Sequence, residues 1–497
     1  MDRGSRLGPG RSARHPVSGG RNHWRHAQAS RRRRMTLRGR ATVVLASAGA
    51  AVALVWLAGP FGAPGSLPAQ HEVVLPDVAA GAPPVRAAAS ALEEHPYPPA
   101  SVLERLPVTQ EVLDLPCLEG EDGDADRGRI CEDVVVSPAD PALPGPLRVE
   151  YTLDVELTRQ VFRVLRQARV KLGNVILMEP TSGRVLAYAS TDVDRFPPTR
   201  NYPAASLVKI ITAATALDRA PQTAKLPCRY RGSPYRLTPS RIDPPKRGHT
   251  VSLRRALATS NNQCFAQLAV HAVGADPLME AIGRFGWLAI PGPAHAAGSA
   301  SPGEDRYDVG RLGCGLSGCR ITPLHAVQLA ASLVHGELVS PRWIERVADA
   351  EGRELRLPPP AAPRRVLSRD ITAELRSMLV DTTKNGTARR AFRNSRGRPL
   401  LGTVQVAGKT GSLSGKDPDG RYEWFIGVAP ADSPRVAIAT VLVQGDLWWR
   451  NSSQVAADVL HGVFCEGRRC SAEGASRYIR IPPATAELAR VPESEAP

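Results

Sequence analysis

The sequence predicts a mixed α/β (α+β) fold, in which helices cover a mainly antiparallel five-stranded sheet and a helical subdomain interrupts the strands. Three observations lead to this prediction. A helical apolar stripe and a hairpin open the ordered region near Val149, residues 203–380 are mostly helical with Pro and Gly punctuation, and three strands and a helix close the region. Such elements bury their apolar faces against each other in layers.

The first elements are a helix and a hairpin. Apolar residues at helical spacing predict the helix over residues 152–169. The hairpin combines strands at 175–178 and 185–189 with the turn Pro180-Thr-Ser-Gly183 between them.

The last elements return to strands. Apolar runs predict strands at 403–407, 424–428 and 436–443, and their short connections favour antiparallel pairing. A closing helix follows, with Ser453 as its expected N-cap.

The positive charge of the chain belongs to its N-terminal tail. The net charge is +16, but residues 1–40 hold 12 arginines and one acid, which gives +11. The remainder has 52 basic (64 − 12) and 47 acidic (48 − 1) residues, a balance of only +5. We therefore expect no nucleic-acid partner.

An apolar run follows the basic tail. Residues 41–59 carry no charge and approach the length of about 20 residues that crosses a bilayer. The arginines before the run place the N-terminus in the cytoplasm, so we expect a single-pass signal-anchor at 41–60 with the rest of the chain outside. A cleaved signal peptide, a buried core helix and a start at Met35 stay open as alternatives.

These features predict five regions. They are a basic cytoplasmic tail (1–40), a transmembrane signal-anchor (41–60), a Pro/Ala-rich extracytoplasmic linker with a small juxtamembrane part (61–149), a folded domain (150–470) and a C-terminal tail (471–497).

Eight cysteines lie after the apolar run, where an oxidising compartment permits disulfides. The pairs closest in sequence are Cys117/Cys131, Cys314/Cys319 and Cys465/Cys470, although sequence alone does not fix connectivity. A metal site at His461, Cys465 and Cys470 lacks a Cys-x-x-Cys motif, so we expect a disulfide there and no metal or cofactor.

Three short motifs occur in one order: Ser206-Leu-Val-Lys209, Ser260-Asn-Asn262 and Lys409-Thr-Gly411. No other Ser-x-x-Lys, Ser-x-Asn or Lys-[Ser/Thr]-Gly is present. The chain contains only 7 lysines against 57 arginines (64 − 7), and two of the lysines lie in these motifs. Because only lysine readily loses its proton, this usage indicates that Lys209 and Lys409 serve chemistry rather than charge alone.

Each motif supplies one part of an acyl-transfer site. Pro203 can start a helix on which Ser206 and Lys209, three apart, share a face, and burial would make Lys209 a base for the serine nucleophile. From a loop between helical pieces, Ser260 can relay a proton between Lys209 and a leaving amine, and Asn262 can hold a substrate amide.

The third motif supplies a substrate edge. Lys409-Thr-Gly411 follows the strand 403–407, where Lys409 and Thr410 can hold a carboxylate and Gly411 permits close backbone approach. The backbone N–H groups of Ser206 and Ser412 could form an oxyanion hole. Taken singly, each motif also fits an ordinary helix, cap or turn.

Together the motifs resemble the penicillin-binding protein transpeptidase and serine β-lactamase superfamily. The resemblance covers about residues 150–465 and extends to further segments: Tyr151–Asp154, Asn174–Ala187, Gly313–Gly315 with Thr322–Leu324, Asn385–Ala388 and Trp424–Pro430. One departure is Ala205, where the family commonly has Gly.

The resemblance implies a peptidoglycan D,D-transpeptidase of the bacterial inner (cytoplasmic) membrane with an extracytoplasmic catalytic domain. It implies Ser206 as the acylated nucleophile, Lys209 as its base, Ser260 and Asn262 as shuttle and positioning groups, and Lys409 with Thr410 as the carboxylate grip. Stem peptides are the implied substrates, β-lactams the inhibitors and a membrane glycosyltransferase a partner. Residues 61–149 are too short for a glycosyltransferase, which leaves the subclass open.

Alternative functions stay open at this point. Water as the acceptor would give a D,D-carboxypeptidase. A class A β-lactamase needs a deacylating glutamate, but no Glu-x-x-Leu-Asn follows Ser260, and Glu280 is a poor substitute. A non-catalytic scaffold or sensor is disfavoured by the retained lysines, and an esterase by the lack of a Gly-x-Ser-x-Gly elbow.

Overall fold

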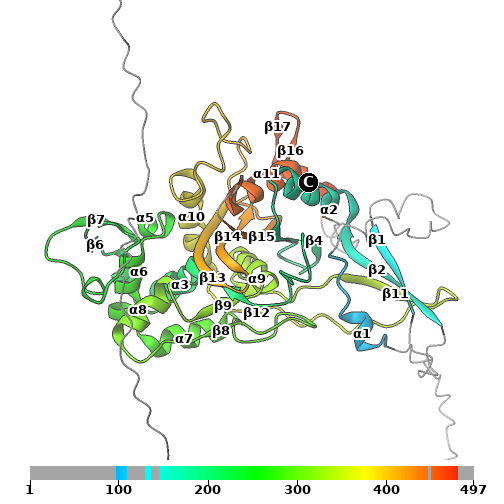
Figure 1. Ribbon diagram of the computed structural model, residues 1–497, viewed down its shortest axis with the longest axis horizontal. Helices are drawn as coiled ribbons and strands as arrows, with labels where there is room; N and C mark the ends of the chain where they lie inside the picture. Colours follow the sequence, from blue (N-terminus) through cyan, green and yellow to red (C-terminus); the bar gives the residue numbers. More distant parts are fainter. Residues whose placement is uncertain (1–96, 109–128, 136–144, 446–448, 480–497) are drawn as a thin grey trace, which may run out of the picture. The chain divides into compact units, whose positions relative to one another are not determined.

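A five-stranded antiparallel sheet lies at the centre of the computed structural model, which describes residues 97–108, 129–135, 145–445 and 449–479. The strands are β3 (Leu172–Met178), β4 (Val185–Ser190), β13 (Ala407–Lys416), β14 (Asp419–Ala429) and β15 (Val436–Gln444). They are ordered β13-β14-β15-β3-β4, with every pair antiparallel (Figure 1). The predicted mixed fold with an antiparallel five-stranded sheet is confirmed.

Helices cover the sheet. All residues of β15 from Val436 to Val443 are buried, as expected for a strand covered on both faces. Two pairs of helices pack on the sheet and against each other within each pair. One pair is α2 (Val155–Gln167) and α11 (Ser452–Phe464), and the other is α9 (Pro323–His335) and α10 (Arg369–Lys384).

A helical subdomain lies between β4 and β13 in the sequence. Figure 1 shows its helices, in green, gathered on one side of the sheet. They are η2 (Ala205–Val208), α3 (Lys209–Arg219), α4 (Pro221–Lys225), η3 (Pro239–Arg241), α5 (Leu253–Ala258), α6 (Asn262–Leu268), η4 (Ala269–Val273), α7 (Ala275–Arg284) and α8 (Arg306–Cys314). The edge strand β13 contacts η2, which brings the subdomain against the sheet.

Small sheets and short elements complete the described residues. A three-stranded sheet combines β1 (Arg129–Val135), β2 (Pro146–Asp154) and β11 (Ile344–Ala348). The other strands are β5 (Tyr202–Pro203), β8 (Ser299–Ala300) and β9 (Cys319–Ile321), β6 (Cys228–Tyr230) with β7 (His249–Val251), β10 (Glu337–Leu338) with β12 (Arg364–Arg365), and β16 (Cys465–Glu466) with β17 (Arg469–Cys470). The remaining helices are α1 (Ala100–Leu103) and η5 (Ala472–Arg477).

The first predicted helix begins later than expected. Residues 152–154 belong to β2, and the side chain of Asp154 caps α2 by accepting a hydrogen bond from the Leu157 N–H at 2.7 Å. The hairpin of 175–178 and 185–189 is present as β3 and β4.

The closing helix begins one residue before Ser453, and its N-cap is Asn451. The Asn451 side chain accepts from the Gln454 N–H, and the Gln454 side chain accepts from the Asn451 N–H, each at 3.0 Å. This reciprocal capping box outweighs the single hydroxyl of Ser453, so the expectation for Ser453 was wrong.

The strand expected at 403–407 was also misplaced. The Val404 N–H bonds the Leu401 carbonyl in a turn, and pairing with β14 starts only at Ala407. Lys409–Gly411 therefore lies inside β13 instead of following a strand.

Two disulfides join pairs of cysteines that both lie in the described ranges. The predicted Cys465–Cys470 pair is confirmed, whereas Cys228–Cys264 was not expected. The expected Cys314/Cys319 disulfide is absent: Cys314 ends α8, Cys319 starts β9, and both thiols are free and buried. Cys117, the expected partner of Cys131, lies outside the described residues.

No helix in the described ranges is long and apolar enough to cross a membrane. The predicted tail at 1–40 and anchor at 41–60 lie outside these ranges, as do Met35 and residues 480–497.

Candidate active site

Ser206 and Lys209 lie at a junction of two helices. Ser206 is in η2, and Lys209 is the first residue of α3. Pro203 does not start this helix, because it pairs with Arg320 in β5 and β9. The three-residue spacing still places the Lys209 Nζ 2.7 Å from the Ser206 Oγ.

Lys209 is fully buried and held by two further acceptors. Its Nζ lies 2.7 Å from the Asn262 Oδ1 and 2.7 Å from the Cys314 carbonyl oxygen. In the neutral amine, these two acceptors would take both N–H groups and leave the lone pair for the Ser206 hydroxyl. Burial lowers the pKa of Lys209 to about 8, which favours this neutral form.

The second motif begins in the connection between α5 and α6 and ends at Asn262, the first residue of α6. Asn262 is fixed on both ends of its amide, because its Nδ2 donates to the Tyr235 carbonyl at 2.8 Å while its Oδ1 faces Lys209. Ser260 has a positive φ of 55°, which is uncommon for a residue with a side chain. Such backbone conformations persist where the surroundings hold them and occur often at functional sites.

Lys409 joins the second and third motifs. Its Nζ donates to the Ser260 Oγ at 2.9 Å and to the Thr410 carbonyl at 2.7 Å. Burial lowers the pKa of Lys409 well below its ordinary value, and the charge of Lys209 acts in the same direction. The expected contact of Ser260 with Lys209 is not formed: within the described residues Ser260 hydrogen-bonds Lys409, while Lys209 contacts Ser206, Asn262 and Cys314.

Gly411 lets β13 pack against the turn that carries Ser206. A Cβ at this position would lie 3.2 Å from the Ala204 carbonyl oxygen and 3.3 Å from the Ala205 Cβ. On either side of Gly411, the Thr410 hydroxyl lies 2.6 Å from that of Thr387, and the Ser412 Oγ accepts from the Arg421 Nε at 2.6 Å.

The three motifs open onto one cavity of about 470 Å³, called here the Ser206 cavity. Six of the eight predicted site residues are in the cavity wall, and the other two, Lys209 and Lys409, lie buried behind it. The wall is formed by Ser206, Tyr235, Ser260, Asn262, Leu316, Thr387, Thr410, Gly411, Ser412, Arg421, Glu423, Trp424 and Asn451–Ser453.

Several of these residues were not found from the sequence. The Cys314 carbonyl and Thr387 lie in segments that resemble the family, but neither pattern indicates a contact with a motif residue. No sequence pattern indicates Arg421 or Glu423 as site residues. Their side chains face the cavity because of the register between β13 and β14, which the sequence does not reveal.

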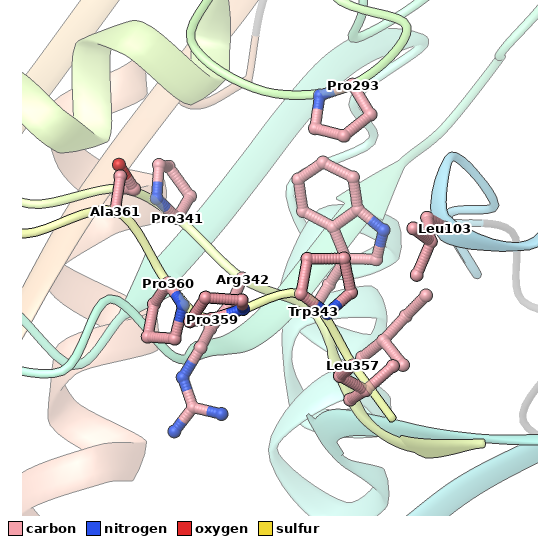
Figure 2. Close-up of a pocket in the computed structure, with 12 residues that line it drawn as sticks. Leu103, Pro293, Pro341, Arg342, Trp343, Leu357, Pro359, Pro360 and Ala361 are labelled. Atoms are coloured by element: carbon pink, nitrogen blue, oxygen red, sulfur yellow. The ribbon is translucent and has the colours of Figure 1, made fainter. Parts of the chain in front are cut away.

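A second cavity of about 400 Å³ lies away from these residues (Figure 2). It is lined mainly by apolar side chains, among them Leu103, Pro341, Trp343 and Leu357. None of the predicted site residues lines it, so it is not the site that the motifs form.

The sulfur atoms of Cys465 and Cys470 and a ring nitrogen of His461 lie within 4.8 Å of one another. The two sulfurs are bonded to each other, and disulfide sulfur is not the thiolate that binds zinc.

Comparison with protein families and relatives gives one consistent result. The model of the penicillin binding protein transpeptidase domain matches residues 173–464. Peptidoglycan D,D-transpeptidase PbpA of Mycolicibacterium smegmatis is 27% identical over 317 residues, covering 55% of this chain and 62% of the relative. Peptidoglycan D,D-transpeptidase FtsI of Escherichia coli K12 is 25% identical over 347 residues, covering 63% of this chain and 54% of the relative. The chain thus matches less than two thirds of the length of these relatives.

Solved structures share the fold. PBPA from Mycobacterium tuberculosis aligns with a TM-score of 0.52 at 23% identity, over 64% of this chain and 81% of that chain. It has also been solved as an imipenem acyl-enzyme complex. The D,D-transpeptidase domain of a peptidoglycan glycosyltransferase from Eggerthella lenta aligns with a TM-score of 0.53 at 20% identity, over 69% of this chain and 93% of that chain.

Proposed function

The chain belongs to the penicillin-binding protein transpeptidase domain family, and on this basis we propose that it is a D,D-transpeptidase that cross-links peptidoglycan stem peptides through a Ser206 acyl-enzyme. The observation that carries the proposal is the position of the Lys209 Nζ, 2.7 Å from the Ser206 Oγ and buried among two other acceptors. A base in this position is what a serine nucleophile needs.

Acylation begins when the neutral Lys209 amine takes the Ser206 proton. The Ser206 Oγ then attacks the carbonyl carbon of the penultimate D-alanine. The backbone N–H groups of Ser206 and Ser412 stabilise the oxyanion that forms, which is commonly a large part of such catalysis. The Asn262 side chain keeps Lys209 in place.

The leaving group is the amine of the terminal D-alanine. Lys409 and Thr410 bind its carboxylate, and this anion favours the charged form of Lys409. The Ser260 hydroxyl donates its proton to the leaving nitrogen as the C–N bond breaks, and it recovers a proton from the Lys409 ammonium, 2.9 Å away. The terminal D-alanine then departs.

Deacylation reverses these steps with a new amine. An amine of a neighbouring stem peptide attacks the acyl carbon, its excess proton returns through Ser260 to Lys409, and Lys209 returns the first proton to Ser206. If water attacks instead, the product is that of a D,D-carboxypeptidase. The same nucleophile would be acylated by β-lactams, as in the imipenem complex of the M. tuberculosis relative.

We further propose where this domain works. The charge pattern around residues 41–60 supports a single-pass anchor in the bacterial inner membrane, with residues 61–149 as the extracytoplasmic linker to a catalytic domain at 150–470. A membrane glycosyltransferase would then supply the glycan strands.

A fluorescent penicillin tests the proposal on the purified full-length chain. The wild type should become labelled, and Ser206→Ala should not. Label on the Ala variant, or none on the wild type, would refute it. A label that persists for hours supports a transpeptidase, whereas rapid loss of label would identify a β-lactamase.

A further inference from the structure

Two charged side chains of the Ser206 cavity have no role in the proposed reaction. Arg421 and Glu423 are two apart on β14, so their side chains leave the same face of the sheet. Glu423 pairs in register with Ser412 of β13. Both residues line the same cavity as Ser206.

Glu423 presents an incompletely satisfied carboxylate. Its side chain is only 12% exposed, and its Oε1 lies 3.5 Å from the Arg421 Nε. Its Oε2 is buried and has no hydrogen-bond partner within the described residues. Burial raises the pKa of Glu423, while Arg421 and the Ser452 backbone N–H oppose the rise. Because Glu423 lines the cavity and its carboxylate has few donors, a cationic ligand there would add a favourable contact.

Arg421 is available for a second contact. Its Nε donates to the Ser412 Oγ at 2.6 Å, and its side chain is 53% exposed. In the described part of the chain its two terminal nitrogens have no hydrogen-bond partner. A guanidinium with both terminal nitrogens available suits a carboxylate.

The direction of β13 shows which part of a substrate reaches this pair. In the proposed reaction, Thr410 binds the carboxylate of the leaving residue and the Ser412 N–H faces the attacked carbonyl. Moving along the strand from Thr410 to Ser412 therefore passes from the substrate's C-terminus toward its N-terminal part. Arg421 and Glu423 lie beside Ser412, on the N-terminal side of the acyl residue.

We propose that Arg421 and Glu423 form a subsite for a zwitterionic side-chain end, with an ammonium and a carboxylate on one carbon, on the donor residue that precedes the acyl D-alanine. The ammonium binds the Glu423 carboxylate, and the carboxylate binds the Arg421 guanidinium. Both contacts are charge-assisted and are stronger than neutral hydrogen bonds. A side chain that ends in an ammonium alone gains only the contact with Glu423, and its positive charge is repelled by that of Arg421. The subsite rests on the proposed function, because it selects that reaction's donor.

Matched donor peptides test the subsite. Three pentapeptides end in D-Ala-D-Ala and differ only in the end of the third side chain: an amino acid group, an ammonium alone, or a methyl group. The full-length chain is assayed for D-alanine release. For the wild type we expect kcat/KM to favour the amino acid end over the methyl end by about tenfold or more, from two charge-assisted contacts.

Variants separate the two contacts. In Glu423→Gln the advantage of the ammonium over the methyl end should fall to within about twofold, and in Arg421→Gln the added carboxylate should bring no gain. Each ratio is taken on one enzyme preparation, so a partly folded variant does not change it. Glu354→Gln is the matched control, because Glu354 is ion-paired with Arg346 at 3.3 Å and does not line the cavity. This control should keep the wild-type ratios.

Three results would overturn either the Arg421–Glu423 subsite or the proposed function. Equal kcat/KM for the three peptides on the wild type would overturn the subsite. Unchanged ratios in both cavity variants would also overturn it and would leave an ordinary surface ion pair. Failure of fluorescent penicillin to label the wild type would instead refute the proposed function, so the two failures are distinguishable.

Discussion

Residue scale: the proposed chemistry depends on one buried amine. Lys209 is fully buried, and its pKa of about 8 makes it a base near neutral pH, where an arginine would stay charged. The Asn262 amide and the Cys314 carbonyl hold this amine against Ser206. The scarcity of lysine in the chain indicates this role, but the Cys314 contact joins residues 105 apart in the sequence and cannot be derived from it.

The base role of Lys209 makes a prediction about pH. Acylation by penicillin should rise about tenfold per pH unit up to about pH 8 and level off above it, because only the neutral amine accepts the proton. Lys209→Arg should lose acylation while keeping the charge. Stopped-flow fluorescence measures both, with the exposed Lys416→Arg as the control. A flat profile between pH 6 and 8, or an active Arg variant, would contradict the role.

Ala205 has a strained backbone conformation next to Ser206. Its φ is 49°, in the left-handed region that costs a residue with a Cβ roughly 1–2 kcal/mol. Ala204 is equally buried but has an ordinary φ of −73°. Both Ala→Gly changes lose a methyl group and gain unfolded-state entropy, but only Ala205→Gly relieves strain.

We therefore expect Ala205→Gly to be more stable than Ala204→Gly by about 1–2 kcal/mol in denaturant unfolding. Equal stability of the two variants would show that the Ala205 backbone carries no strain.

Element scale: local sequence patterns identified most of the helices and strands. They missed the strand boundaries and side-chain directions that depend on pairing between strands. The hairpin β3–β4 was predicted because its apolar runs and turn lie within 20 residues. The start of β13 was missed because Gly408, Gly411 and Gly415 interrupt its pattern, although β14 pairs with it throughout. The wall residues Arg421 and Glu423 follow from this same register.

The unexpected disulfide fixes an element beside the site. Cys228–Cys264 joins β6 to α6 across a sequence separation of 36, and the enclosed segment carries Tyr235, whose carbonyl holds Asn262. Local spacing favoured closer cysteine pairs, so sequence gave no reason to connect these two.

Loop length sets the expected contributions of the two disulfides. Replacing Cys228 and Cys264 by Ser should lower the free energy of unfolding by about 3–4 kcal/mol. The same change at Cys465 and Cys470, with a separation of only 5, should cost about 2 kcal/mol. Denaturant unfolding measures the free energy of unfolding of both double variants. A larger loss of this free energy for the Cys465/Cys470 variant, which has the shorter loop, would contradict the expectation.

Whole-molecule scale: the site forms where the helical subdomain meets the edge of the sheet. The subdomain brings Ser206 on η2, Lys209 on α3, Ser260 between α5 and α6 and Asn262 at the start of α6, while β13 brings Lys409. Three motifs spread over 206 residues of sequence, from Ser206 to Gly411, thus share one cavity. The order of the motifs indicated that they share one site, because in the proposed reaction each motif performs one part.

The measurement that tests this account most directly is peptide mapping by mass spectrometry after the full-length chain reacts with penicillin. We predict one penicilloyl group, attached to Ser206 and stable during digestion. A group attached to another residue, or a chain that stays unmodified while folded, would contradict the central claim that Ser206 is the acylated nucleophile.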